Sequence, residues 1–219
     1  MNNIGLIIRF HYQECDSRVA WRYQHFVNKV LPRIQSQSYK DFDTCVWCYD
    51  WHKEMFERYG LKTFSVVSEE KYERYIIHNN KPFYEDFTPW GCVYNLPQYE
   101  TQVRIDSDDY IKQEFMYKVY TTVEDHKQQF EDKTLFLSFQ PRLLRLSTGN
   151  AVPMLNYAEN KWGSAFAALY QPLNNNTQYR FIYDSSHLTF GNSCDRQIWI
   201  HGDYCLALAH SLNESTGKW

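Results

Sequence analysis

The stretch IGLII, from Ile4 to Ile8, decides the fold class of this 219-residue chain. A short apolar run without alternation is typical of a strand that is buried on both faces, as the strands of parallel sheets are. Asp16 and Ser17 can cap a helix after this strand, and apolar residues recur at helical spacing over residues 17–36. The amino-terminal segment therefore predicts a buried strand followed by a helix.

The same alternation continues along the chain. Residues 41–49 predict a second strand, residues 53–59 a helix, and residues 62–67 a third strand. Strand, helix, strand, helix, strand is the signature of right-handed βαβ units. We therefore expect an α/β fold with a central, mostly parallel sheet that is flanked by helices.

An acidic cluster follows the next expected strand. Residues 78–100 are interrupted by Pro and Gly and predict a loop, whereas residues 101–105 alternate polar and apolar and predict a strand. This strand ends in Asp106-Ser107-Asp108-Asp109, and residues 110–123 then have helical periodicity. Open α/β sheets bind ligands at the carboxyl ends of their strands, so we expect the acidic cluster at a ligand-binding edge.

The pattern becomes less regular after residue 133. The elements that we expect there are strands at 134–139, 142–146 and 179–183, and helices at 164–170 and 203–212. The whole chain, residues 1–219, is expected to form one domain, with an amino-terminal half of about 1–125 and a carboxyl-terminal half of about 126–219.

The composition excludes several classes of protein. With 43% apolar residues, 22% charged residues and a formal net charge of −3, the chain is neither disordered nor fibrous, and it lacks the basic excess for nucleic acid or anionic membranes. No apolar run approaches the ~18 residues that cross a bilayer, and no signal peptide is visible. We expect a cytoplasmic protein without a transmembrane segment. In such a protein, Cys45 and Cys48 are expected to be reduced structural thiols and not half of a zinc site.

Aromatic residues are abundant, with 7 Trp, 18 Tyr and 14 Phe forming 18% of the chain. Aromatic faces can stack on sugar rings, whose C–H groups are weakly apolar. Core packing is the ordinary role of any single ring. The aromatic content is therefore compatible with a sugar ligand without requiring one.

The acidic cluster suggests a metal-bound diphosphate. In extended backbone, Asp106 and Asp108 point to one face, together with Arg104. Two neighbouring carboxylates repel each other unless a cation lies between them, and Mg²⁺ or Mn²⁺ bound to carboxylates commonly holds a substrate phosphate. A solvated acidic turn remains the alternative. A calcium-binding EF-hand loop is excluded, because Ile111 takes the place of its glycine and Tyr117 that of its final glutamate.

Several segments together resemble a rhamnosyltransferase family of the GT-A type. They are Arg9-Phe10, the pattern Leu31-Pro32-x-Ile34-x-x-Gln37-x-Tyr39-x-x-Phe42, the segment Gln102 to Asp109, and the segment Ile198 to Asp203. The resemblance implies a Rossmann-like GT-A fold and a hexosyltransferase that moves rhamnose or another hexose from a UDP-, dTDP- or GDP-sugar to a glycan or glycolipid acceptor, as in the biosynthesis of cell-surface polysaccharide. Residues 1–125 would then form the nucleotide-sugar-binding half and residues 126–219 the acceptor half.

The resemblance also implies roles for individual residues. Asp108 is similar to the direct metal ligand of the DXD motif, and Asp106 to the residue that contacts the metal or the ribose. Asp109 would contact the donor sugar, Asp50 the base or ribose, and His201 would complete a Mn²⁺ or Mg²⁺ site.

Further binding and catalytic candidates follow from the chemistry of the transfer. The guanidinium groups of Arg9 and Arg104 suit phosphate, and Trp162, Trp199 and His187 are candidate acceptor contacts. An inverting transfer needs a general base for the acceptor hydroxyl. The candidates are Glu159, Asp184, Asp195 and Asp203. The resemblance to GT-A enzymes, whose base tends to lie at the start of a helix in the acceptor half, implies Glu159 first and Asp184 second.

Two other functions are compatible with the same residues. A lectin-like module would bind glycan with its aromatic rings and hold a structural Ca²⁺ at the acidic cluster. A metal-dependent phosphate ester hydrolase would use the same carboxylates without requiring an intact nucleotide sugar.

Overall fold

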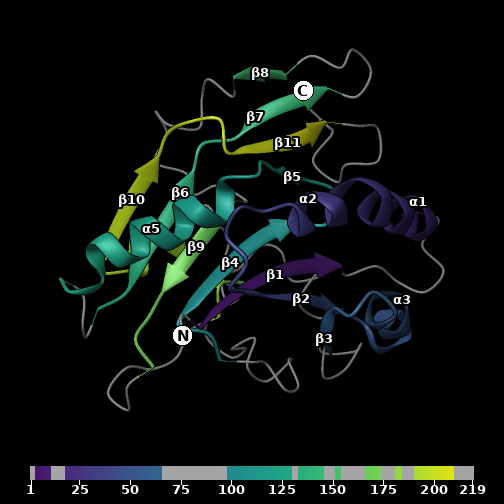
Figure 1. Cartoon of the computed structure of the whole chain (residues 1–219), viewed down its shortest axis with the longest axis horizontal. Helices are drawn as coiled ribbons and strands as arrows, with labels where there is room; N and C mark the ends of the chain where they lie inside the picture. Colours follow the sequence, from purple (N-terminus) through teal and green to yellow (C-terminus); the bar gives the residue numbers. More distant parts are fainter. Residues whose placement is uncertain are drawn as a thin grey trace, which may run out of the picture.

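A computed structural model describes residues 3–10, 18–65, 98–129, 133–145, 151–153, 166–173, 181–183 and 190–209. Within these residues, seven strands form the central sheet in the order β10-β6-β9-β4-β1-β2-β3 (Figure 1). Their bounds are β1 (Ile4–Phe10), β2 (Asp43–Cys48), β3 (Lys62–Ser65), β4 (Thr101–Asp106), β6 (Leu135–Phe139), β9 (Ala167–Tyr170) and β10 (Arg196–Ile200). The strands β4, β1, β2 and β3 run parallel, as do β6 and β10, whereas β9 runs antiparallel between β4 and β6.

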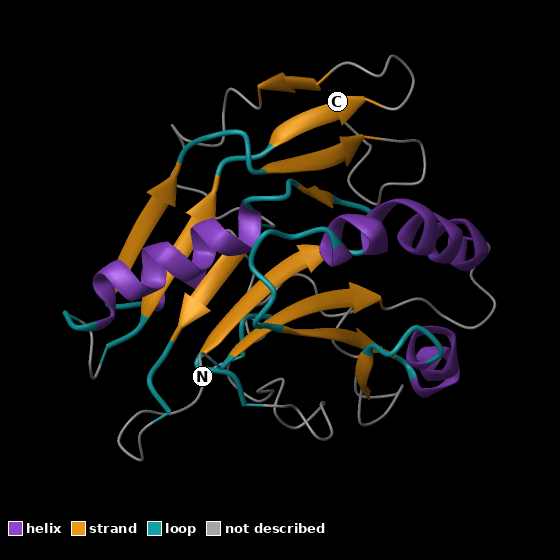
Figure 2. Cartoon of the chain, in the orientation of Figure 1, coloured by secondary structure: helices purple, strands orange, loops and turns teal. Residues whose placement is uncertain are grey.

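A smaller sheet lies beyond the carboxyl ends of β6 and β10, at the top of Figure 2. In the described part of the chain it has four strands in the order β5-β11-β7-β8. They are β5 (Tyr110–Ile111), β7 (Arg142–Arg145), β8 (Ala151–Pro153) and β11 (Cys205–Ala209). Because β7 follows β6 and β11 follows β10, the second sheet continues directly from the central one.

The helices largely follow the expected βαβ pattern. The expected helix at 17–36 is a succession of α1 (Arg18–His25), the π-helical segment η1 (Phe26–Val30) and α2 (Leu31–Gln35). Pro32 lies in the first turn of α2, where its missing N–H costs little. The other helices are the 3₁₀ turn η2 (Asp50–His52), α3 (Lys53–Glu57), α5 (Phe115–Lys127) and the 3₁₀ turn η4 (Phe190–Ser193).

Alternate residues of the central strands fill two separate cores. On one face, Leu6, Ile8 and Val103 pack with residues of α5 such as Val119. On the other face, Ile7 packs with Trp47, Phe136, Leu169, Phe181 and Tyr183. Burial on both faces is what the uninterrupted apolar run of β1 predicts, because side chains alternate between the faces of a strand. The expected α/β class with a mostly parallel sheet is therefore confirmed.

The carboxyl-terminal expectations were partly wrong. The predicted helix at 164–170 is the strand β9 in its described part, because Ala167–Tyr170 pairs with β4 on one side and with β6 on the other. The predicted helix at 203–212 contains β11, which pairs with β5 and β7. Residues 181–183 form a turn and not the end of a strand. The rest of the expected strand, 179–180, lies outside the described residues, as do 78–97 of the expected loop.

The helix expected at 110–123 begins later than predicted. Tyr110 and Ile111 pair with Leu206 and Cys205, and α5 starts only at Phe115. The helical spacing of the sequence cannot reveal this start, because the first two residues pair with β11, which is distant in the sequence. None of the helices in the described ranges has the length and apolar character needed to cross a bilayer.

His52 makes folding sensitive to pH. Its side chain is buried against the Phe10 ring, with centroids 5.3 Å apart, and its Nδ1 atom has no hydrogen-bond partner among the described residues. Burial lowers the pKa of His52, so the folded state disfavours the protonated ring. The free energy of unfolding should be greatest above the ordinary pKa of about 6.5 and should fall as the pH drops below it.

The variant His52→Phe should lose this part of the pH dependence, because Phe keeps an aromatic ring and cannot be protonated. Urea unfolding at a series of pH values between about 8 and 5 measures it. The wild-type chain should lose more stability than the variant as the pH falls. Identical pH dependence in the two proteins would show that protonation of His52 does not oppose folding.

Candidate functional site

The strand order reverses between β1 and β4. From β1 the chain proceeds to β2 and β3 on one side and then returns to β4 on the other. In open α/β sheets, ligands commonly bind at the carboxyl ends of the strands where the order reverses in this way. Arg9 of β1 is paired in register with Asp106 of β4 at this edge. We call the carboxyl ends of β1 and β4, with the turn 106–109, the switch edge.

Arg9 and Asp106 form a partly exposed ion pair at the switch edge. Arg9 Nη2 lies 3.7 Å from Asp106 Oδ1, and the two side chains are 41% and 29% exposed. The contact is long for a charge-assisted hydrogen bond, and exposed pairs contribute little to stability. Part of each side chain is therefore accessible from solvent.

Asp108 faces a different direction from Asp106. The backbone N–H of Asp109 donates to the carbonyl of Asp106 at 3.2 Å, so residues 106–109 form a turn. The prediction that Asp106, Asp108 and Arg104 share one face assumed extended backbone through Asp108, and the turn makes it wrong. The side chains of Asp108 and Asp109 are buried instead.

Arg22 of α1 forms a buried ion pair with Asp108. Arg22 Nη1 contacts Asp108 Oδ2, and both side chains are almost completely buried. A buried charge is tolerated only when it is paired and hydrogen-bonded. The pair therefore fixes α1 against the turn that ends β4. Sequence reasoning missed Arg22, because a basic residue on an amphipathic helix usually lies on the solvated face.

Tyr183 joins β1 to β4 directly behind the switch edge. Its hydroxyl lies 3.0 Å from the carbonyl oxygens of both Ile7 and Ile105 and donates its proton to this pair. The guanidinium of Arg104 lies over the Tyr183 ring, 4.2 Å from its centroid. Burial raises the pKa of Tyr183, so the hydroxyl stays protonated. Sequence reasoning missed this residue because its partners are backbone atoms, which leave no pattern in the sequence.

Other predicted residues lie apart from this cluster. Asp50 follows β2 at the same edge of the sheet, but its side chain is 72% exposed and pairs with Lys53 at 2.8 Å. His201 follows β10, which is separated from β4 by β6 and β9, and its Nδ1 lies 2.9 Å from Gln140 Oε1. The predicted residues Glu159, Trp162, Asp184 and His187 lie outside the described residues.

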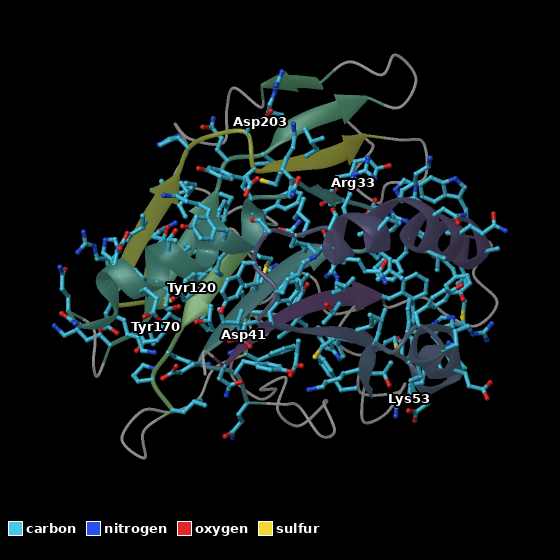
Figure 3. All side chains as sticks on the ribbon, in the orientation of Figure 1. Arg33, Asp41, Lys53, Tyr120, Tyr170 and Asp203 are labelled. Atoms are coloured by element: carbon cyan, nitrogen blue, oxygen red, sulfur yellow. The ribbon has the colours of Figure 1, made fainter. Side chains whose placement is uncertain are left out.

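The two remaining base candidates have structural contacts. Asp195 Oδ2 accepts hydrogen bonds from the backbone N–H and the hydroxyl of Thr134, at 2.7 and 2.8 Å. These bonds lower the pKa of Asp195, whereas a general base at neutral pH needs a raised one. Asp203 pairs with Lys112 at 2.9 Å and with Arg142 at 3.7 Å, at the start of the second sheet (Figure 3).

The residues as placed do not fit the predicted metal site. Among the described residues, no group of three or more His, Cys, Asp and Glu side chains is arranged to hold a metal ion. Asp108 is paired with Arg22, and His201 lies beyond two intervening strands. Cys45 and Cys48 are buried thiols, and burial raises the pKa of Cys45 to about 11 and of Cys48 to about 12. Neither thiol is prepared to bind a metal as a thiolate.

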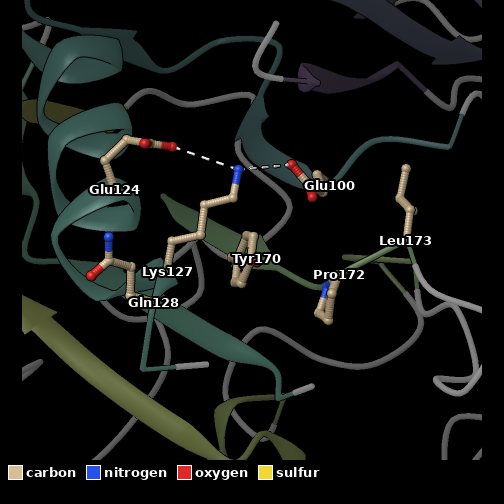
Figure 4. Close-up of a pocket in the computed structure, with 7 residues that line it drawn as sticks. All are labelled: Glu100, Glu124, Lys127, Gln128, Tyr170, Pro172 and Leu173. Carbon is tan, nitrogen blue, oxygen red and sulfur yellow. Dashed lines mark hydrogen bonds and ion pairs between the residues drawn. The ribbon is translucent and has the colours of Figure 1, made fainter. Parts of the chain in front are cut away.

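A hollow of about 540 Å³ lies at the opposite end of β4 (Figure 4). It is lined by Glu100, Glu124, Lys127, Gln128, Tyr170, Pro172 and Leu173. Lys127 Nζ lies 3.2 Å from Glu100 and 3.7 Å from Glu124, so its charge is already balanced. The hollow is at the amino end of the strand and is not part of the switch edge.

Solved structures share this fold at low sequence identity. The chain matches S. aureus TarS (residues 1–349, in complex with UDP-GlcNAc) with a TM-score of 0.58 and 13% identity, covering 100% of this chain and 62% of that one. It matches the mannosyltransferase PcManGT from Pyrobaculum calidifontis, in complex with GDP-Man and Mn²⁺, with a TM-score of 0.50 and 11% identity, covering 94% and 56%.

These likenesses confirm the expected GT-A-type fold and do not single out rhamnosyltransferases. The chain spans less than two thirds of either matched chain. No protein-family model matches the sequence, and no curated protein matches it.

The variant Tyr183→Phe tests the connection between β1 and β4. It removes the only polar atom of the side chain and leaves two buried carbonyls with one donor fewer, so we expect a loss of about 1 kcal/mol in the free energy of unfolding. Tyr117→Phe is the matched control, because the Tyr117 side chain on α5 is 52% exposed. Urea unfolding of both variants measures the difference. Equal stabilities of the two variants would contradict the role of the Tyr183 hydroxyl.

Proposed function

We propose that this chain is a glycosyltransferase that moves a hexose from a nucleotide diphosphate donor to a glycan or glycolipid acceptor. The observation that carries the proposal is the pairing of Arg9 with Asp106 at the switch edge of a GT-A-type sheet. Support comes from two proteins of the same fold, of which TarS holds UDP-GlcNAc and PcManGT holds GDP-Man. Rhamnose, the sequence-based expectation, is one candidate hexose.

The donor is proposed to lie across the carboxyl ends of β2, β1 and β4. Asp50 would contact the base or ribose, Asp106 the ribose, and Asp109 the donor sugar. Arg9 is the exposed guanidinium of this edge and would bind the diphosphate. Arg104 is buried behind the edge and stacked on Tyr183, so we assign it a positioning role in place of direct phosphate binding.

The proposed transfer breaks the bond between the anomeric carbon and the diphosphate oxygen. Negative charge develops on the departing diphosphate, and a guanidinium fixed beside it lowers the barrier. The acceptor hydroxyl attacks the anomeric carbon and gives its proton to a carboxylate, for which Glu159 and then Asp184 remain the candidates. Trp162 and His187 would contact the acceptor. Because the described residues do not fit a cation between Asp106 and Asp108, no step is assigned to one.

The rest of the sequence-based organisation belongs to the same proposal. Residues 1–125 form the donor half, which contains β1 to β4, and residues 126–219 form the acceptor half. A lectin-like module and a phosphate ester hydrolase remain alternatives. The lectin would not bind nucleoside diphosphates, and the hydrolase would not require a sugar on its substrate.

Arg9→Gln tests the donor site. Isothermal titration with UDP, GDP and dTDP should show binding of at least one of them by the wild-type chain, and the variant should weaken that Kd by tenfold or more, about 1.4 kcal/mol. Arg142→Gln is a matched control, because the Arg142 side chain is also 41% exposed and also lies 3.7 Å from an aspartate, Asp203.

The control should bind the nucleotide as the wild-type chain does. If none of the three nucleotides binds, or if Arg9→Gln and Arg142→Gln behave alike, the donor site is not at the switch edge. Release of nucleoside diphosphate from UDP-GlcNAc or GDP-Man in the presence of a glycan acceptor would distinguish transfer from simple binding.

Glu159→Gln and Asp184→Asn test the general base. Each substitution keeps the shape of the side chain and removes the proton acceptor, so the variant of the true base should lose about 10²–10⁴-fold in transfer rate with an unchanged Kd for the nucleotide. The other variant serves as the control. A normal transfer rate in both variants would show that neither Glu159 nor Asp184 is the general base.

A further inference from the structure

Arginines from other elements contact the turn that follows β4. The turn has three carboxylates, those of Asp106, Asp108 and Asp109. Arg9 contacts Asp106 and Arg22 contacts Asp108. Arg104 is buried behind this edge, with its guanidinium 4.2 Å from the centroid of the Tyr183 ring. Two of the three carboxylates of the turn therefore have a guanidinium counter-charge.

Arg22 and a divalent cation would compete for the same carboxylate. Both side chains of the pair are almost completely buried. Asp108 is therefore largely desolvated, and its charge is stabilised by the guanidinium in place of water. A metal ion bound to Asp108 Oδ2 would have to displace the Arg22 guanidinium from that oxygen. A guanidinium is permanently charged, and its N–H donors match the geometry of a carboxylate. It can therefore neutralise a carboxylate as a divalent cation would.

The exposed cation of the edge is a different residue. Arg9 keeps 41% of its side chain exposed and lies on the strand next to Asp106, whereas the Arg22 side chain is only 5% exposed. A nucleotide can therefore reach Arg9 and cannot reach Arg22. A metal ion would both neutralise the carboxylates and bind the phosphates. Here Arg22 neutralises Asp108, and Arg9 is the arginine that a diphosphate can contact.

We propose that Arg22 is an internal counter-cation that takes the place of a divalent metal at Asp108, so that nucleoside diphosphate binds to this chain without a metal ion. The part about the nucleotide rests on the proposed function. The part about Asp108 does not, because it concerns which cation the carboxylate holds. Arg22 is a positioning residue here, since it acts through Asp108 and does not touch the donor.

Titration of the wild-type chain with UDP, GDP and dTDP tests the first part. The Kd of any nucleotide that binds should be the same in excess EDTA and in excess Mn²⁺ to within about twofold. A Kd that Mn²⁺ tightens by tenfold or more would overturn the proposal. If no nucleotide binds under either condition, the proposed function fails, and the second test still decides the role of Arg22.

Electron paramagnetic resonance of Mn²⁺ alone tests the second part. Arg22→Met keeps a long side chain and removes the charge, so this variant should bind Mn²⁺ at least tenfold more tightly than the wild-type chain. The double variant Arg22→Met with Asp108→Asn should lose the gain. Equal Mn²⁺ affinity of wild type and Arg22→Met, or a gain that survives Asp108→Asn, would overturn the proposal.

Two further variants cover the case in which Arg22→Met does not fold. Arg22→Lys keeps a buried positive charge beside Asp108 and should bind Mn²⁺ no better than the wild-type chain. Asp106→Asn changes the partly exposed carboxylate and leaves the buried pair in place, so it should not alter Mn²⁺ binding either. Tighter Mn²⁺ binding by Arg22→Lys than by the wild-type chain would overturn the proposal, because a positive charge would still lie beside Asp108.

Discussion

The buried ion pair between Arg22 and Asp108 is the contact on which the arrangement of the switch edge depends. It connects the first helix to the turn at the end of β4, two segments that are far apart in the sequence. Removal of one partner from such a pair typically costs about 3–5 kcal/mol, because the other charge stays buried. This contact holds the Asp108 side chain in the interior, whereas the Asp106 side chain stays partly exposed.

The topology supplies the remainder of the site. Parallel pairing of β1 with β4 aligns Arg9 with Asp106, and the strand order reverses between them, which is where open α/β sheets commonly bind ligands. Tyr183 reaches this point from the carboxyl-terminal half and joins Ile7 to Ile105 behind the charged pair. Each half of the chain therefore contributes to the rigidity of one edge.

The sequence predicted elements whose signal is local and missed those that depend on distant partners. The run Ile4–Ile8, the helical spacing after it and the acidic end of β4 are readable from neighbouring residues. Ala167–Tyr170 is too short and too uniformly apolar to show a period, so its strand identity comes from the flanking β4 and β6. Asp106 was placed correctly at a strand end, but alternation cannot foresee the turn that separates it from Asp108, nor the arginine that meets Asp108 in space.

A crystal structure of this chain with UDP and Mn²⁺, with data collected at the manganese absorption edge, tests the central claim most directly. The account predicts the diphosphate within hydrogen-bond distance of Arg9, Asp108 still paired with Arg22, and no anomalous peak between Asp106 and Asp108. A manganese peak bonded to both carboxylates with Arg22 displaced, or a nucleotide bound elsewhere on the chain, would contradict it.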